Sequence, residues 1–216
     1  MLTLYSYWRS SAAYRVRIAL NLKGLPYQQV PVHLIKDGGQ QHSADYQALN
    51  PQALLPLLVD NGNGGVLIAQ SLAILEYLDE VFPVPALLPS HPAQRAQVRA
   101  LALHIACDLH PLNNLRVLQY LTGELGVSDA AKDGWYQHWL HKGLAAVEAG
   151  LVVFDERLSL GERPGYLEAC LVPQLYNARR FNCDLDAYPR ILAMAARCES
   201  LEAFKQAAPE VQPDAQ

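Results

Sequence analysis

The hydrophobic pattern of this chain changes near residue 83, and the change divides the sequence into two parts. Before it, strand-like segments alternate with segments of helical spacing, in the order β-α-β and then β-β-α. The strand-like segments are residues 2–5, 27–34, 55–59 and 66–68, and the helical ones are residues 13–23 and 71–82. Beyond it, helical spacing recurs in residues 94–121, 129–153, 166–181 and 188–204. The pattern predicts an α/β domain followed by an all-α domain.

The boundary is marked by a cluster of prolines. Pro83, Pro85, Pro89 and Pro92 lie where the pattern changes, in a stretch with few apolar residues. Such a stretch is typical of a linker. We therefore predict domains at 1–82 and 88–216, with a loose tail over residues 209–216, which contain two prolines and little apolar surface.

Composition excludes several classes of function. Of the 216 residues, 51% are hydrophobic and 18% are charged, which is typical of a globular protein. The net charge of −4 and the lack of a basic run argue against a nucleic-acid partner. The chain shows neither a membrane-spanning apolar stretch nor a signal peptide, which predicts a cytoplasmic protein. Its four cysteines are far apart and form no CxxC pair, which predicts buried thiols, no disulfide framework and no metal site.

A first candidate site lies between the first strand and the first helix. Ser10 and Ser11 stand where the helix presents free N–H groups, an arrangement that favours an anion. A thiol held there would lose its proton more easily, because the helix dipole and a hydroxyl donor stabilise the thiolate. The alternative is that either serine only caps the helix.

Two further segments of the first domain show the same ambiguity. A cis bond between Leu55 and Pro56 would turn the backbone of Leu55 outward to pair with a peptide-like ligand, although Pro56 could equally open an ordinary strand. Ser71 precedes a helical run and could hold a ligand carboxylate through its N–H and hydroxyl, or could simply cap that helix.

Taken together, several motifs resemble a known family over nearly the whole chain. In the first domain they are Ser10-Ser11 with Arg15-Val16-Arg17, the segment 36–41, Ala48-Leu49-Asn50-Pro51 and Gln70-Ser71; in the second they are the segments 110–116, 171–174 and 177–181. This combination resembles the zeta class of glutathione transferases, which includes maleylacetoacetate and maleylpyruvate isomerases. The resemblance implies a thioredoxin-like domain followed by an all-helical domain, glutathione as cofactor and a homodimer.

The resemblance also assigns roles to individual residues. Ser10 and Ser11 would be catalytic and contact the sulfur of glutathione. The rest of the glutathione site would consist of Gln41 at the glycyl end, Leu55 and Pro56 at the cysteinyl backbone, Gln70 and Ser71 at the γ-glutamyl end, and His110 and Asn114 from the second domain. Arg9, Arg116 and Arg180 would bind the carboxylates of a small dicarboxylate substrate, unless they are ordinary surface arginines. Arg15 and Arg17 are expected to support the first helix and nearby loops.

The reaction that the resemblance implies is isomerisation of maleylacetoacetate to fumarylacetoacetate by reversible addition of the glutathione thiolate. Alternatives are a maleylpyruvate isomerase, a transferase or dehalogenase acting on small α-halo acids, and a non-catalytic glutathione-binding protein.

The sequence departs from the family pattern at two places. Ala12 replaces a cysteine, which argues against disulfide exchange, and residues 151–165 do not match, although Gly165 and Glu168 still permit a helix cap.

Overall fold

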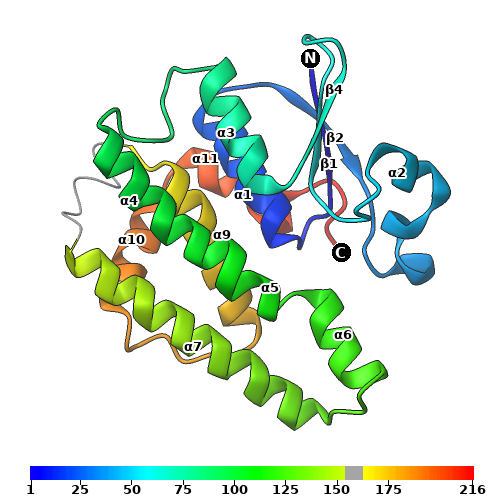
Figure 1. The fold of residues 1–216 in the computed structure, drawn as a ribbon, viewed down its shortest axis with the longest axis vertical. Coiled ribbons are helices and arrows are strands. Elements are labelled where there is room, and N and C mark those ends of the chain that lie inside the picture. Colours follow the sequence, from blue (N-terminus) through cyan, green and yellow to red (C-terminus); the bar gives the residue numbers. More distant parts are fainter. Residues whose placement is uncertain (154–162) are drawn as a thin grey trace. The chain divides into compact units, whose positions relative to one another are not determined.

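A computed structural model describes residues 1–153 and 163–216 of the chain (Figure 1). The backbone forms two compact units. The first consists of Met1–Leu87 together with Glu199–Gln216, and the second of Leu88–Cys198. The sequence placed residues 199–216 with the helical domain, whereas in the structure they pack with the first unit.

The first unit is built on a four-stranded mixed sheet of order β2-β1-β3-β4. Its strands are β1 (Leu2–Ser6), β2 (Tyr27–Pro31), β3 (Leu57–Asp60) and β4 (Val66–Ala69). β1 runs parallel to β2 and antiparallel to β3, and β3 and β4 form the hairpin that the sequence predicts. The expected α/β fold of this part is confirmed.

Three main helices surround this sheet. They are α1 (Ser11–Leu22), α2 (Ala44–Leu49) and α3 (Ser71–Val81), and α2 was not predicted. Figure 1 shows α1 and α3 on one side of the strands and α2 on the other. Apolar side chains of α1 and α3, such as Ile18 and Leu75, are fully buried, so these two helices form the core of the unit with the sheet.

A buried ion pair between Lys23 and Asp79 holds the segment that follows α3. The Lys23 ammonium donates to Asp79 Oδ1 at 2.8 Å, to the carbonyl of Phe82 at 2.7 Å and to that of Pro85 at 2.8 Å. Asp79 Oδ1 also accepts the N–H of Leu87 at 2.7 Å. The ordered path of residues 82–87 therefore depends on one charged pair.

The prediction of a loose C-terminal tail is wrong. The tail follows α11 (Glu202–Lys205) and contains the short helix η4 (Pro209–Val211). Pro209 and Gln212 are buried, and the Gln212 side chain donates to the carbonyls of Gln206 and Ala208 at 2.9 and 2.7 Å. This segment has little apolar surface, and hydrogen bonds order it instead.

The described part of the second unit is helical and contains no strand, as expected. Its elements are α4 (Pro92–Leu103), η3 (His104–Leu109), α5 (His110–Leu112), α6 (Leu115–Gly123), α7 (Asp129–Val153), α9 (Tyr166–Arg180) and α10 (Pro189–Glu199). α9 is buried over most of its length, which makes it the central helix of the unit. No helix of the described residues is long and apolar enough to cross a membrane.

The stretch 94–121, which reads as one periodic segment, is interrupted in the structure. The segment η3 is a π-helix, and Pro111 lies two residues after its last residue, Leu109. Proline lacks an N–H group and disturbs the helical ladder before it, which accounts for the wider turn here. Asn114 then caps α6 through its side chain, which accepts the N–H of Arg116 at 3.2 Å.

Two expectations outside the site can be compared with the structure. Glu168 accepts the N–H of Gly165 at 2.8 Å, as the cap predicts, while residues 154–162 of the segment that departs from the family pattern lie outside the described residues. Cys170, Cys183 and Cys198 are buried and form no disulfide, but Cys107 is exposed. The prediction for Cys107 was wrong because it lies on a solvent-facing position of the π-helix, which helical periodicity does not anticipate.

Candidate functional site

Strand register brings the predicted segments of the first unit to one end of its sheet. Ser6, the last residue of β1, pairs with Pro31 at the end of β2, and Tyr5 pairs with Leu57 at the start of β3. Leu57 pairs in turn with Ala69, the last residue of β4. The loops that follow β1, β2 and β4 and the loop that precedes β3 therefore meet at this end. These loops carry the predicted residues from Arg9 to Ser71.

The two serines lie at the N-terminus of α1. Ser10 is the N-cap, and its Oγ accepts the N–H of Ala13 at 3.2 Å. Ser11 is the first residue of the helix and is buried. The capping role that we considered for Ser10 is therefore present, but its hydroxyl proton can still be donated to another acceptor. Both hydroxyls stand where the helix dipole favours negative charge.

The Leu55–Pro56 peptide bond is cis, as expected. The preceding loop is fixed through the carbonyl of Leu54, which accepts the hydroxyl of Tyr46 at 2.7 Å and the side-chain amide of Asn50 at 2.8 Å. Burial raises the pKa of Tyr46 to about 12, so this donor stays protonated at neutral pH. Within the described residues, the backbone of Leu55 itself makes no hydrogen bond.

Gln70 and Ser71 open α3 in an unusual conformation. Gln70 has a φ of 70°, which is rare for a residue with a side chain, and its amide contacts that of Gln52. Ser71 is the first residue of α3, is buried, and accepts a hydrogen bond from Arg15 Nη1 at 3.2 Å. Arg15 thus ties the start of α3 to α1, as its expected supporting role requires.

Gln41 is buried in the loop that follows β2. Its Nε2 donates to the carbonyl of Leu34 at 3.4 Å, and its Oε1 has no hydrogen-bond partner among the described residues. Gly39 lies directly against this amide, since a Cβ at that position would come 2.5 Å from Gln41 Nε2. A buried acceptor without a donor is uncommon, which marks Gln41 as able to accept an N–H group from a ligand.

Arg9 completes the group in the first unit. Its guanidinium lies over the Trp8 ring, 4.7 Å from the ring centroid, and donates to the Tyr7 hydroxyl at 3.2 Å. Trp8 and Tyr7 were not singled out in the sequence. Aromatic stacking of this kind restrains an arginine without neutralising its charge.

In the second unit, His110 and Asn114 are in contact, with 3.3 Å between His110 Nε2 and Asn114 Nδ2. Arg116, two residues further on, is exposed on α6. Three of the four predicted residues of this unit are already neighbours in the sequence, and the structure adds the contact between His110 and Asn114.

Arg180, the fourth, lies at the exposed C-terminal end of α9. Its Nη1 donates to Asn177 Oδ1 at 3.0 Å, and its guanidinium lies 5.7 Å from the centroid of the Phe181 ring. Phe181 stacks in turn on Tyr136 of α7, with ring centroids 3.9 Å apart. Asn177 was not predicted as a partner of Arg180, although their three-residue spacing on a helix is a usable signal. That arginines of the two units share one site stays a prediction.

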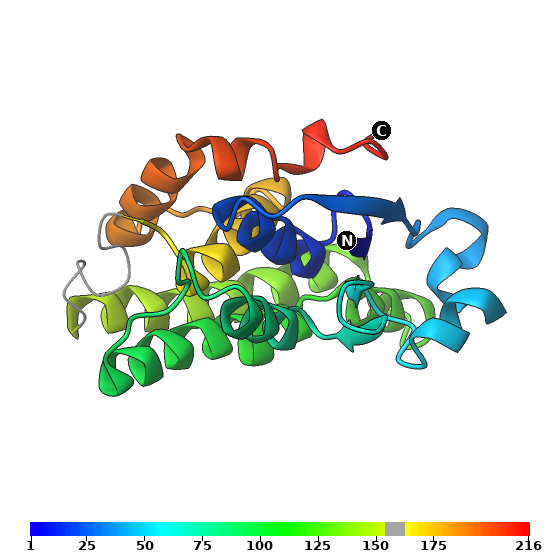
Figure 2. The ribbon, with the colours of Figure 1, turned by 90° about the horizontal axis from the view of Figure 1, so that it is seen from above.

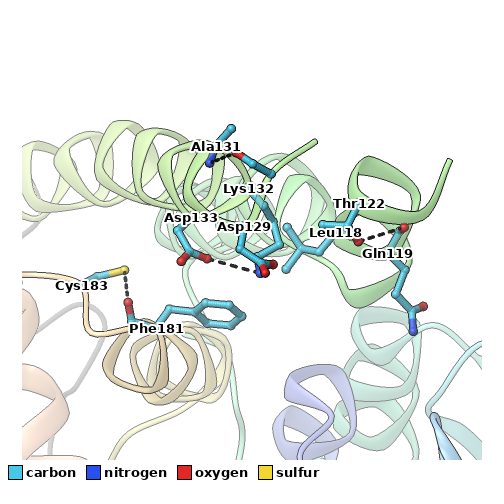
Figure 3. Close-up of polar contacts among 10 residues, drawn as sticks. Leu118, Gln119, Thr122, Asp129, Ala131, Lys132, Asp133, Phe181 and Cys183 are labelled. Atoms are coloured by element: carbon cyan, nitrogen blue, oxygen red, sulfur yellow. Dashed lines mark hydrogen bonds and ion pairs between the residues drawn. The ribbon is translucent and has the colours of Figure 1, made fainter. Parts of the chain in front are cut away.

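Two titratable side chains beside Phe181, those of Tyr136 and Cys183, have raised pKa values. Burial raises the pKa of the Tyr136 phenol, and burial together with the nearby Asp133 carboxylate raises the pKa of the Cys183 thiol. Figure 3 shows this thiol directed at the carbonyl of Phe181, from which its sulfur lies 3.7 Å. Tyr136 and Cys183 are therefore neutral near pH 7, and the positive charge at this end of α9 comes from Arg180 and its neighbour Arg179.

Comparison with known proteins gives consistent matches. The family described as "Glutathione S-transferase, N-terminal domain" matches residues 1–80. A probable maleylacetoacetate isomerase of Vibrio cholerae is 54% identical, over 99% of this chain and 98% of its own length.

Solved structures agree with these matches. A maleylpyruvate isomerase, described as a bacterial glutathione S-transferase in the zeta class, has a TM-score of 0.92 and 44% identity and covers 99% of this chain and 100% of its own. A maleylacetoacetate isomerase from Methylobacterium extorquens AM1, solved with bound malonate and glutathione, has a TM-score of 0.90 and 36% identity, with 99% of both chains covered.

Proposed function

Because this chain belongs to the zeta-class glutathione transferase family, we propose that it is a glutathione-dependent cis–trans isomerase that converts maleylacetoacetate into fumarylacetoacetate. The observation that carries the proposal is the convergence of four loops at one end of the sheet. There the N-terminus of α1, the cis proline and the start of α3 present separate polar groups.

The residues at this end of the sheet fit glutathione. The peptide backbone of Leu55 is available for pairing with a peptide-like ligand, and Gln41 Oε1 is a buried acceptor that a glycyl N–H can satisfy. Gln70 adopts a strained backbone conformation, which is a frequent mark of a ligand-binding position. Ser71 offers a helix N-terminus to the γ-glutamyl carboxylate. Pro56 fixes the direction of the chain beside them, and His110 and Asn114 complete the proposed binding residues.

When bound, glutathione supplies a thiolate that adds to the cis double bond, permits rotation about the resulting single bond and then leaves. The protein must hold that sulfur as an anion near neutral pH. Ser10 and Ser11 serve this purpose, because their hydroxyls can donate to the sulfur and the α1 dipole favours its negative charge. They are the proposed catalytic residues.

The substrate carries two carboxylates, for which arginines are suited. Arg9, stacked on Trp8, and Arg180, held by Asn177, are presented in restrained orientations, and Arg116 is exposed nearby in sequence to Asn114. A guanidinium can grip a carboxylate through two parallel hydrogen bonds. These positive charges also offset the negative charge that develops on the substrate during rotation.

A second candidate is isomerisation of maleylpyruvate, which the 0.92 TM-score to a maleylpyruvate isomerase favours. Glutathione transfer to small α-halo acids would use the same residues. Disulfide exchange would not, because Ala12 stands at the helix start and residues 9–15 contain no cysteine.

The proposal is tested by adding purified protein to maleylacetoacetate, with and without glutathione, and following formation of fumarylacetoacetate. Glutathione-dependent turnover that favours this substrate over maleylpyruvate supports the proposal. A preference for maleylpyruvate supports the second candidate. Retention on immobilised glutathione without turnover of either would identify a binding protein.

The compartment and assembly are also part of the proposal. We place the protein in the cytoplasm as a homodimer. All four cysteines lie in the described residues and none of them forms a disulfide, which suits a reducing compartment. Val81 on α3 and Leu103 on α4 are exposed apolar residues, and sedimentation analysis would test the dimer.

A further inference from the structure

The C-terminal segment, residues 206–215, returns to the loop that carries the proposed catalytic serines. Figure 2 shows this segment, in red, running alongside the blue N-terminal elements of the same unit. Asp214 Oδ2 accepts the backbone N–H of Trp8 at 3.0 Å, although the two residues are 206 positions apart. Asp214 Oδ1 accepts the side-chain amide of Gln29, on β2, at 3.3 Å.

Arg17 holds the following peptide group, which contains the carbonyl of Trp8. It is fully buried, and its Nη2 donates to the carbonyl of Trp8 at 2.9 Å. Its Nε donates to the carbonyl of Ala207 in the C-terminal segment at 3.0 Å, and its Nη1 donates to Ser6 Oγ at 3.1 Å. Trp8 is therefore fixed through its N–H by Asp214 and through its C=O by Arg17. Hydrogen bonds to charged groups are the stronger kind in proteins.

Trp8 contacts Arg9, and its neighbour Tyr7 contacts Ser10, so the position of Trp8 affects both proposed site residues. The guanidinium of Arg9 rests on the Trp8 ring, and the N–H of Ser10 donates to the carbonyl of Tyr7 at 2.9 Å. A shift of the Trp8 peptide would thus move a proposed carboxylate-binding residue and a proposed thiolate-binding residue together.

We propose that Asp214 is a positioning residue, which holds the loop of residues 7–10 in the conformation that presents Ser10 and Arg9. The inference rests on the proposed function, because it assigns the C-terminal segment a part in the glutathione site. A displacement of reacting groups by about 1 Å can lower a rate roughly 100-fold. We therefore expect Asp214→Ala to lower kcat by about 10- to 100-fold.

Asp214→Asn should rescue most of this loss. Its amide oxygen can still accept the N–H of Trp8, and its amide nitrogen can donate to the side-chain oxygen of Gln29 after that amide turns over. The matched control is Glu202→Ala. Glu202 is an exposed carboxylate on α11 that accepts a hydrogen bond from Gln206, and its removal should leave kcat unchanged.

Two further measurements separate positioning from a general loss of stability. The first is the hydrogen-exchange rate of the Trp8 and Ser10 amides by NMR, in the free protein. The second is the pH titration of the thiol of bound glutathione, followed by thiolate absorbance. Asp214→Ala should speed exchange at both amides and raise the pKa of the bound thiol, while thermal unfolding still shows a folded protein.

The inference is overturned if Asp214→Ala leaves kcat, amide exchange and the thiol titration as in the wild type. If the alanine variant does not fold, Asp214→Asn is tested in its place. The inference is also overturned if Asp214→Asn retains wild-type stability but loses as much activity as is expected for Asp214→Ala. If the wild-type chain isomerises neither maleyl substrate, the proposed function fails alone. Amide exchange and thiol titration would still decide the role of Asp214.

Discussion

Removal of the Asp79 carboxylate should destabilise the first unit far more than the loss of an ordinary ion pair. The Lys23 side chain is 0% exposed and the Asp79 side chain 8% exposed, so Asp79→Ala leaves a buried ammonium without its counter-charge. Breaking a buried pair in this way costs about 3–5 kcal/mol. The N–H of Leu87 loses its acceptor as well. The unfolding equilibrium constant should therefore rise roughly 100- to 4,000-fold.

Urea unfolding, followed by tryptophan fluorescence and by circular dichroism, measures this change. Asp79→Asn keeps an oxygen acceptor and should cost less. The double variant Lys23→Met with Asp79→Leu should recover much of the loss, because a buried pair can often be replaced by apolar side chains. Asp129→Ala is the control, since its pair with Lys132 is solvent-exposed and should not contribute measurably. A loss of less than about 1 kcal/mol for Asp79→Ala would refute the reasoning.

The remaining predictions concern the site and its surroundings. Ser10→Ala and Ser11→Ala should each lower kcat/KM about 100-fold, and Ser10→Ala should also destabilise the protein by about 1 kcal/mol in urea unfolding, since it removes a helix cap. Arg180→Gln should raise KM for the dicarboxylate roughly 10- to 100-fold in steady-state assays. Native protein should react with a thiol reagent at Cys107 alone, as peptide mapping would show. Tyr46→Phe should weaken the alkaline loss of stability, because the contribution of this phenol is present below pH 10 and is lost as pH rises through about 12.

Much of the fold could be predicted from local pattern. The strands of the first unit and α1, α3, α7 and α9 were recognised, because alternation and helical spacing are properties of short segments. α2 was missed because its six residues are too few to show a helical repeat. The break between α4 and α6 was missed because Pro111 and the asparagine cap interrupt a segment that keeps helical spacing on both sides.

The contacts that hold the site could not be predicted, because they join residues far apart in the chain. Lys23 has the pattern of an exposed helix residue, yet its ammonium is buried against acceptors from the segment after α3. Arg17 was expected to support nearby loops, but its hydrogen bond to Ala207, far along the chain, was not predicted. Asp214 belongs to a stretch with little apolar surface, and its partners Trp8 and Gln29 give no local sign of the contact. The candidate residues themselves were found through the combined motifs, while the roles proposed for them depend on chemistry that only binding and activity can test.

The most direct test of the central claim compares glutathione with S-methylglutathione, which has the same peptide but no free thiol. Maleylacetoacetate is supplied to the purified protein with either compound, and formation of fumarylacetoacetate is corrected for the rate without protein. The account predicts turnover with glutathione and none with S-methylglutathione, even at concentrations at which the methylated peptide competes for the site. Equal turnover with both would contradict it, because isomerisation would then need no thiolate.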